Sequence, residues 1–316
     1  MSQELNLENS MKQLLILIKR NMKLFFKDKG VFFTSLITPL ILLVLYVTFL
    51  GNVYKNTFND IIPDIFHNLE GYDEIINGLV GSQLFSSLLA VSCITVAFSS
   101  NMIMVSDKVN GTIDDILITP VKKSTLAISY YVATFLNTLL VCMCAFFACL
   151  IYLAIVGWYL SFVDVMLIVL DILVLTMFGT ALSSLVNFFL KSQGQISAVG
   201  AIVSSCYGFI CGAYMPISSF GETLQKILSF LPGTYGTSLL RNHTMNGPIE
   251  ALSNLSSNGI SIPDELIKGI KDAVDSNVYF FDNLVKEWQM FLFLGLSVLV
   301  ILGSYILLTI LKKKYK

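Results

Sequence analysis

A series of long apolar runs constrains the fold of this chain more than any other feature. Each run is about 20 residues or longer, the length that an α-helix needs to cross the hydrocarbon core of a bilayer. Their approximate limits are 31–50, 79–105, 125–156, 163–190, 196–214 and 288–311. Only 13% of the residues are charged, against about 25% in an average soluble domain. We therefore predict an all-α integral membrane protein with six transmembrane helices in one domain, residues 1–316.

The segment before the first run predicts an amphipathic helix over residues 11–29. Its apolar residues recur at the i, i+3, i+4, i+7 spacing of one helix face, namely Met11, Leu14, Leu15, Ile18, Met22, Phe25 and Phe26. Basic residues, among them Lys23 and Lys27, fall largely elsewhere around the helix. This pattern is typical of a helix that lies in the membrane interface. Residues 1–10 are polar, and we expect them to be disordered.

Positive charge is unevenly divided between the two sides that six spans would define. Of the 20 Lys and Arg residues, 14 fall in segments that would share one side: residues 11–30, 106–124, Lys191 and the C-terminus. Of the 21 Asp and Glu residues, 13 fall on the other side. Lys and Arg are retained in cytoplasmic loops. The sequence therefore predicts a multi-pass protein of the plasma membrane with both termini in the cytoplasm.

The polar segment 106–123 separates the second and third runs and carries the most specific sequence pattern. Its charges and its backbone cannot be solvated by hydrocarbon, so it must leave the bilayer. An acidic and a basic residue are followed by Gly-Thr, by a short amphipathic stretch and by Thr-Pro-Val-Lys. The residues of the pattern are Asp107, Lys108, Gly111, Thr112, Leu117, Thr119, Pro120, Val121 and Lys122.

This pattern resembles the cytoplasmic loop of ABC-2 type permeases, the membrane subunits of ATP-binding-cassette exporters, and looks closest to the drug- and antibiotic-resistance branch. Asp107 stands where the family usually has Glu, and Val109 replaces a second acidic residue. The resemblance implies a bacterial exporter whose ATPase docks on this loop and on helix 11–29. The implied docking residues are Asp107, Lys108, Gly111, Thr112, Asp114, Asp115, Leu117, Thr119 and Pro120, with Arg20, Lys23 and Lys27 on the connecting helix.

The sequence holds no Gly-x-x-x-x-Gly-Lys-Ser/Thr phosphate-binding loop. ATP and Mg²⁺ are therefore expected on a separate ATPase chain. For this chain we expect no catalytic residues, no cofactor and no metal. The resemblance further implies a dimeric core, formed with a second copy or with a sister permease, in which spans two and five open and close a central path.

A second pattern lies between the fifth and sixth runs. It resembles the external segment of the same family, in which short re-entrant helices dip into the outer leaflet and form a gate. The residues concerned are Gly212, Tyr214, Pro216, Pro232 and Tyr235. A plain extracellular loop is the alternative. The polar insert that follows, 242–285, contains one short helical pattern at 263–274 and is not part of the resemblance.

Span four contains an acidic residue, Asp171, within apolar sequence. Such a residue normally faces a partner or a water-filled cavity, so either a structural pair or a role in the substrate pathway fits. Asn101, Asn137 and Asn187 are expected to hydrogen-bond between helices. Both histidines, His67 and His243, fall outside the predicted spans.

The predicted function is the export of a hydrophobic or amphipathic compound or a peptide, driven by the partner ATPase. Export of a lipid-linked cell-surface polysaccharide is the alternative within the family. A membrane scaffold or receptor that acts through the insert 242–285 is the alternative outside it. A membrane enzyme lacks support because no histidine lies in a predicted span. Nucleic-acid binding lacks support because the sequence has no basic segment interleaved with aromatic residues. The expected partners are thus the ATPase, a second permease, membrane lipid and the substrate.

Overall fold

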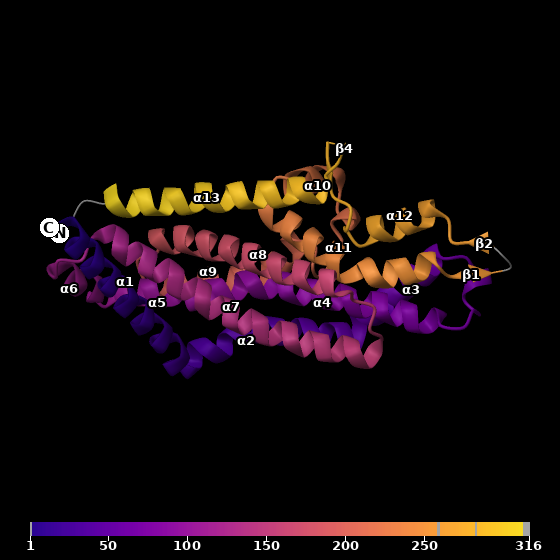
Figure 1. Cartoon of the computed structure of the whole chain (residues 1–316), viewed down its shortest axis with the longest axis horizontal. Helices are drawn as coiled ribbons and strands as arrows, with labels where there is room; N and C mark the ends of the chain where they lie inside the picture. Colours follow the sequence, from indigo (N-terminus) through magenta and orange to yellow (C-terminus); the bar gives the residue numbers. More distant parts are fainter. Residues whose placement is uncertain (1, 258–259, 282, 312–316) are drawn as a thin grey trace.

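The computed structural model describes residues 2–257, 260–281 and 283–311, and it shows an elongated bundle of helices (Figure 1). In chain order, the helices are α1 (Ser2–Lys27), α2 (Lys29–Leu45), α3 (Gly51–Ile61), α4 (Tyr72–Ser100), α5 (Met102–Val109), α6 (Thr112–Ile118), α7 (Lys123–Val156), α8 (Phe162–Phe189), α9 (Gln193–Ile210), α10 (Glu222–Leu228), α11 (Pro232–Ser253), α12 (Asp264–Ala273) and α13 (Glu287–Leu311). Two small antiparallel hairpins pair β1 (Ser256–Ser257) with β2 (Ile260–Ser261) and β3 (Tyr279–Phe280) with β4 (Asn283–Leu284). The prediction of an all-α membrane protein is confirmed.

Two ends of the bundle differ in what they carry. The start of α1 lies at the same end as α5 and α6, which we call the loop end (Figure 1). The opposite end carries α3, α12 and the hairpin β1–β2, and we call it the insert end (Figure 1). The long helices run between the two ends.

Within the described residues, five helical segments are long and apolar enough to cross a membrane. They are Lys29–Ile61, Tyr72–Val109, Lys123–Val156, Phe162–Phe189 and Glu287–Leu311. Helix α9, at the predicted fifth span, has only 18 residues, and two of its first three are Gln193 and Gln195, so it is less apolar than the others. The count of six spans therefore stays a prediction.

The N-terminal part of the chain differs from its prediction in two places. Helix α1 begins at Ser2, so residues 2–10 are helical and were wrongly predicted to be disordered. The helix of the first span does not end near residue 50, because it continues through a π-helical turn, Tyr46–Leu50, into the more polar α3. The extension is stable because Tyr54 and Phe58, one helical turn apart, are both buried in the main core.

The insert is shorter than the sequence predicted. Residues 242–253 belong to α11, which runs for 22 residues where the sequence predicted a short re-entrant helix. The buried face of α11 is largely polar or small, with Thr237, Ser238, Arg241 and Thr244 among its members, so hydrophobic periodicity could not reveal it. Helix α12 agrees with the helical pattern predicted at 263–274.

Helix α4 forms the centre of the bundle and packs against α2, α7, α8, α9 and α11. Nearly all of its residues are buried, and many are small, which allows neighbouring backbones to come close. At Gly179 of α8, an added Cβ would lie 2.7 Å from the Cys93 carbonyl oxygen of α4. Two of the predicted asparagines link the spans as expected: Asn101 donates to Ser183 and Ser184, and Asn137 donates to Ser100.

Candidate functional site

The predicted docking loop forms two short helices at the loop end. A turn at Asn110 and Gly111 joins α5 to α6, and Gly111 has φ +78°, a conformation that residues with a Cβ rarely adopt. Helix α6 has no buried residue. Asp114, Asp115, Thr119 and Pro120 are exposed, and Ile118 has 79% of its surface exposed. The loop therefore presents a small, partly apolar and acidic helix on the surface.

Asp107 lies beneath this surface and joins three helices. Its carboxylate accepts hydrogen bonds from Nη1 of Arg20 at 2.5 Å, from Nη2 of Arg20 at 3.0 Å and from the Tyr130 hydroxyl at 2.6 Å. The three residues belong to α5, α1 and α7. The hydrogen bond to Asp107 raises the pKa of Arg20, which stays charged. This cluster, which we call the Asp107 clamp, fixes α1 to the base of the loop.

Lys108 also makes contacts within the chain. Its Nζ donates to the carbonyl oxygens of Asn187, Phe188 and Leu190, at 3.2, 2.7 and 2.6 Å. These carbonyls lie at the C-terminus of α8, where helix backbones leave acceptors unpaired and a positive charge is favourable. The predicted docking residues therefore divide into two groups. Asp107 and Lys108 hold the loop in place, whereas Asp114, Asp115, Thr119 and Pro120 face outward.

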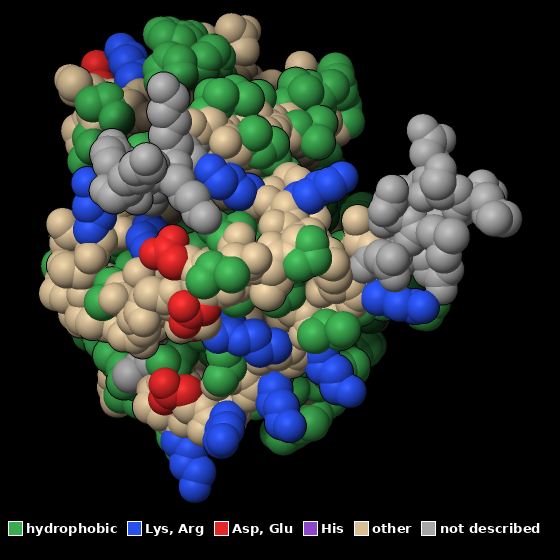
Figure 2. Space-filling model, turned by 90° about the vertical axis from the view of Figure 1, so that its left-hand side faces the viewer, with side chains coloured by type: hydrophobic (Ala, Val, Ile, Leu, Met, Phe, Trp, Pro, Cys, Tyr) green, Lys and Arg blue, Asp and Glu red, His purple; other side chains and the backbone are tan. Residues whose placement is uncertain are grey.

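The face of the loop end is rich in positive charge. Lys and Arg side chains gather on this face and outnumber Asp and Glu (Figure 2). Lys23 and Lys27 of α1 are exposed, whereas Arg20 is half-buried in the clamp. α1 also exposes apolar residues, with 59% of Leu15 and 68% of Ile16 accessible. This distribution agrees with a basic amphipathic helix in the membrane interface.

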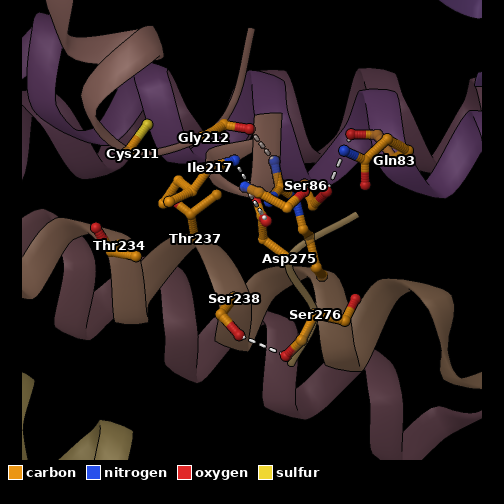
Figure 3. Close-up of polar contacts among 12 residues, drawn as sticks. Gln83, Ser86, Cys211, Gly212, Ile217, Thr234, Thr237, Ser238, Asp275 and Ser276 are labelled. Carbon is orange, nitrogen blue, oxygen red and sulfur yellow. Dashed lines mark hydrogen bonds and ion pairs between the residues drawn. The ribbon is translucent and has the colours of Figure 1, made fainter. Parts of the chain in front are cut away.

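The predicted gate residues surround a turn at the end of α9. Gly212 has φ +75°, and its carbonyl oxygen accepts a hydrogen bond from Nη2 of Arg241 on α11. Arg241 is 1% exposed and pairs through Nη1 with Asp275 Oδ2 at 3.4 Å. Asp275 in turn accepts from the backbone N–H groups of Ile217, at 2.6 Å, and Ser218, at 3.3 Å (Figure 3). We call this group the Arg241–Asp275 lock.

The other predicted gate residues lie on either side of this lock. Tyr214 is half-buried and packs on Phe209 at 5.1 Å between ring centroids, while Pro216 precedes a 3₁₀ turn, Ile217–Ser219. Pro232 begins α11, and the buried Tyr235 hydroxyl donates to the Ser229 carbonyl at 2.5 Å. The structure thus brings the predicted gate residues to the same end of α11.

Sequence reasoning missed the central role of Asp275. Burial raises the pKa of the Asp275 carboxyl, and the neighbouring Arg241 opposes that shift. Asp275 follows α12 in the insert, which no family pattern covered. The signal that was available was Arg241, a lone cation in a stretch of small and apolar residues, because a buried Arg needs an acidic or carbonyl partner.

Asp171 has a partner that the sequence did not indicate. His243 Nδ1 lies 2.6 Å from Asp171 Oδ2, and His243 Nε2 lies 3.8 Å from Oε2 of Glu287. The pair is buried, at 1% exposure for Asp171 and 5% for His243. His243 was predicted outside the spans, but α11 packs against α8 and brings it to Asp171. Among the described residues, no three His, Cys, Asp or Glu side chains are placed to hold a metal ion.

Helices α4 and α5 form one continuous segment, Tyr72–Val109, which we call the α4–α5 rod. A pocket of about 940 Å³ lies between α2, this rod and α9. Most of its lining is apolar, and hydroxyl groups come from Thr95, Ser99, Ser197, Ser204 and Ser205. Asp28 is the charged residue in the lining, and Asp171 is not part of it. The pocket therefore suits a molecule with a large apolar surface and a few hydrogen-bonding groups.

Long apolar helices, a pocket between them and an exposed helix at one end define a membrane-spanning transport component. The sequence profile of the ABC-2 type transporter family matches residues 12–244, so the chain belongs to this family. The match runs from α1 into α11 and includes both α6 and the Gly212 turn. No sequence among the curated proteins matches this chain. The family resemblance is confirmed, and the drug-resistance branch stays a prediction.

Proposed function

We propose that this chain is the membrane subunit of an ATP-driven exporter that moves a hydrophobic or amphipathic compound or peptide. Separate ATPase subunits dock at the loop end and supply ATP hydrolysis and Mg²⁺. The positive charge of that end supports a cytoplasmic location for it and for both termini. The chain acts as a dimer, with itself or with a sister permease.

The observation that carries this proposal is the combination of an exposed helix, α6, with a rigid support beneath it. α6 has no fully buried residue: Ile113, Ile116 and Leu117 pack partly on the core beneath it, and its other face is exposed. The Asp107 clamp and Lys108 nevertheless hold its base against α1, α7 and α8. A surface helix on a rigid support transmits the displacement of a docked subunit without absorbing it. The ATPase then shifts the population of permease states through its preference for one of them.

The pocket supports the proposed class of substrate. Its walls are apolar with scattered hydroxyl groups, and apart from Asp28 they carry no charge. A strongly charged substrate would lose its hydration there without compensation. The pocket is partly open to the surface of the single chain, and a second permease would complete it.

In the experiment, the chain is expressed with its neighbouring genes, the solubilised chain is purified, and any ATPase that accompanies it is identified and assayed. The double variant Asp114→Arg/Asp115→Arg reverses charge on the exposed face of α6. Asp264→Arg, an exposed acidic position at the start of α12, is the matched control at the opposite end. We expect the ATPase to accompany the wild type and the control but not the double variant. Equal recovery with both variants, or no ATPase with the wild type, would refute the proposal.

The substrate class needs a separate test in proteoliposomes that contain the complex. Ala201→Phe places a ring in the pocket, whereas Leu299→Phe places one on the exposed surface of α13. We expect amphipathic compounds to stimulate the ATPase of the wild type and of Leu299→Phe, and stimulation to be lost in Ala201→Phe. If amphipathic compounds still stimulated the ATPase of Ala201→Phe, the pocket would not be part of the substrate pathway.

A further inference from the structure

The hairpin β3–β4 presents a cluster of aromatic rings on the surface. Phe280 and Phe281 lie at its tip, and their ring centroids are 5.2 and 6.0 Å from that of Phe230, which follows α10. Phe230 is 53% exposed and Phe281 is 57% exposed. Three contiguous phenylalanines on a surface are costly in water, and exposed apolar clusters of this kind mark sites of contact with a membrane or a protein.

The hairpin is held firmly on the bundle rather than left loose. Val278 and Val285 flank the tip and pack with Tyr235 of α11 and Met290 of α13. The Val285 N–H donates to the Val278 carbonyl oxygen at 2.9 Å. Phe281 has φ +45°, a left-handed conformation that is unusual for a bulky residue. A glycine would fit that backbone more easily, so a phenylalanine there indicates that its side chain has a use.

The position of the hairpin indicates what covers the rings. The strand β4 ends at Leu284, and the membrane-spanning helix α13 begins at Glu287. The hairpin therefore lies at the level where α13 enters the membrane, and β4 projects sideways from the bundle beside α10 (Figure 1). Trp288, at the first turn of α13, is 61% exposed. Tryptophan at the end of a span is typical of the membrane–water interface.

Chemical features around the rings also match a lipid surface. α10 exposes apolar residues next to the cluster, with Ile227 57% accessible. Lys226 of α10 and Lys286 before α13 are both exposed. Glu222 of α10 and Glu287 of α13 are exposed as well, so the match to lipid rests on the aromatic and apolar side chains, which fit the acyl boundary of a phospholipid leaflet.

We propose that Phe230, Phe280 and Phe281 insert into the phospholipid leaflet at the level where α13 begins and anchor the N-terminal end of α11 in the membrane. A second copy of the chain does not fit as the occupant. α13 packs on α7, α8 and α11, whereas the pocket that a second copy would complete lies between α2, α4 and α9. Because Tyr235 packs on the hairpin and Asp275 precedes it by four residues, the anchor ties the Arg241–Asp275 lock to the lipid.

The proposal depends on the chain being a membrane protein, not on the direction of transport or on the ATPase. It is tested with the full chain in phosphatidylcholine vesicles and a single tryptophan. The sequence has two tryptophans, and both are replaced by phenylalanine, Trp158→Phe and Trp288→Phe. Phe281→Trp then reports on the tip, and Phe230→Trp is a second probe. Ile65→Trp is the matched control, because Ile65 is 51% exposed and lies next to β1 at the far insert end.

Fluorescence is compared in ordinary lipid, in lipid brominated near the top of its acyl chains and with iodide in the water. For a ring roughly 5–10 Å below the headgroups, we expect brominated lipid to reduce the Phe281→Trp signal about twofold, with little effect of iodide. Ile65→Trp should respond in the opposite way. Quenching of both Phe281→Trp and Phe230→Trp by iodide would overturn the proposal. Protection from both quenchers would also overturn it and would indicate protein at the tip.

Discussion

The Asp107 clamp gives the sharpest single prediction. Asp107→Asn keeps the size of the side chain and removes its charge, so Arg20 loses its counterion and Tyr130 loses a charged acceptor. Arg20→Gln removes the other side of the pair. If Asp107 acts through Arg20, the two single variants and the double variant Asp107→Asn/Arg20→Gln should destabilise the chain by similar amounts.

The magnitude follows from the exposure of the pair. A hydrogen bond to a charged group contributes about 1.5–3 kcal/mol to stability. The Arg20 side chain is 31% exposed and that of Asp107 is 10% exposed, so water replaces part of what Arg20 loses. We therefore expect about 1.5 kcal/mol, near the low end of the range, which is about a tenfold change in the unfolding equilibrium. The coupling energy between the two sites should be about the same size.

The assay is unfolding of the purified chain in mixed micelles with increasing SDS, followed by circular dichroism. Asp115→Asn is the matched control, since it removes a negative charge from the same loop at an exposed position. We expect Asp115→Asn to change stability by less than about 0.5 kcal/mol. If Asp107→Asn behaved like this control, or if the effects of Asp107→Asn and Arg20→Gln simply added, the reasoning about the clamp would be wrong.

Three further predictions use the same unfolding assay. Burial raises the pKa of the Asp275 carboxyl in the folded chain above its ordinary value of 3.8. The stability that this shift contributes is fully present below pH 3.8 and is lost as the pH rises through the folded-state pKa. Asp275→Asn should remove this dependence of stability on pH. Gly247→Ala, whose Cβ would overlap a neighbouring carbonyl group, should cost about 3 kcal/mol, whereas Gly295→Ala, in open space, should be nearly neutral. His243→Ala leaves the Asp171 carboxyl buried without its partner and should lower the stability by about 3 kcal/mol. The double variant Asp171→Asn/His243→Ala should lose less stability, because it also removes the buried carboxyl.

Hydrophobic length predicted the helices whose own sequences are apolar over about 20 residues. It located α7, α8 and α13 to within a few residues, because a bilayer requires about 20 apolar residues of every span. It failed at α3 and α11, where the helix packs on protein beyond or beside the apolar spans. There a polar residue such as Ser238 is buried by donating to the Ser276 carbonyl, and no periodicity in one segment can indicate a partner in another.

The same limit explains what was missed at the candidate sites. The loop pattern located Asp107 and Lys108 from adjacent residues, but their contacts come from α1, α7 and α8. Surface and internal roles therefore could not be separated from sequence. The Asp275 carboxylate accepts hydrogen bonds from Ile217 and Ser218, which lie 58 and 57 residues earlier in the chain. No sequence pattern around Asp275 indicates these distant partners.

The architecture connects the two ends through one continuous element. α4 and α5 together form the span Tyr72–Val109, which carries Asp107 at the loop end and packs along α11 for much of its length. The junction between the two helices is Asn101, whose side chain donates to Ser183 and Ser184 of α8. A displacement of α6 therefore moves α8 together with the rod unless those hydrogen bonds break. Because α8 holds His243 of α11 through Asp171, the same displacement reaches the helix that carries Arg241. The rod and α8 thus provide two parallel mechanical routes from the proposed docking surface to the Arg241–Asp275 lock.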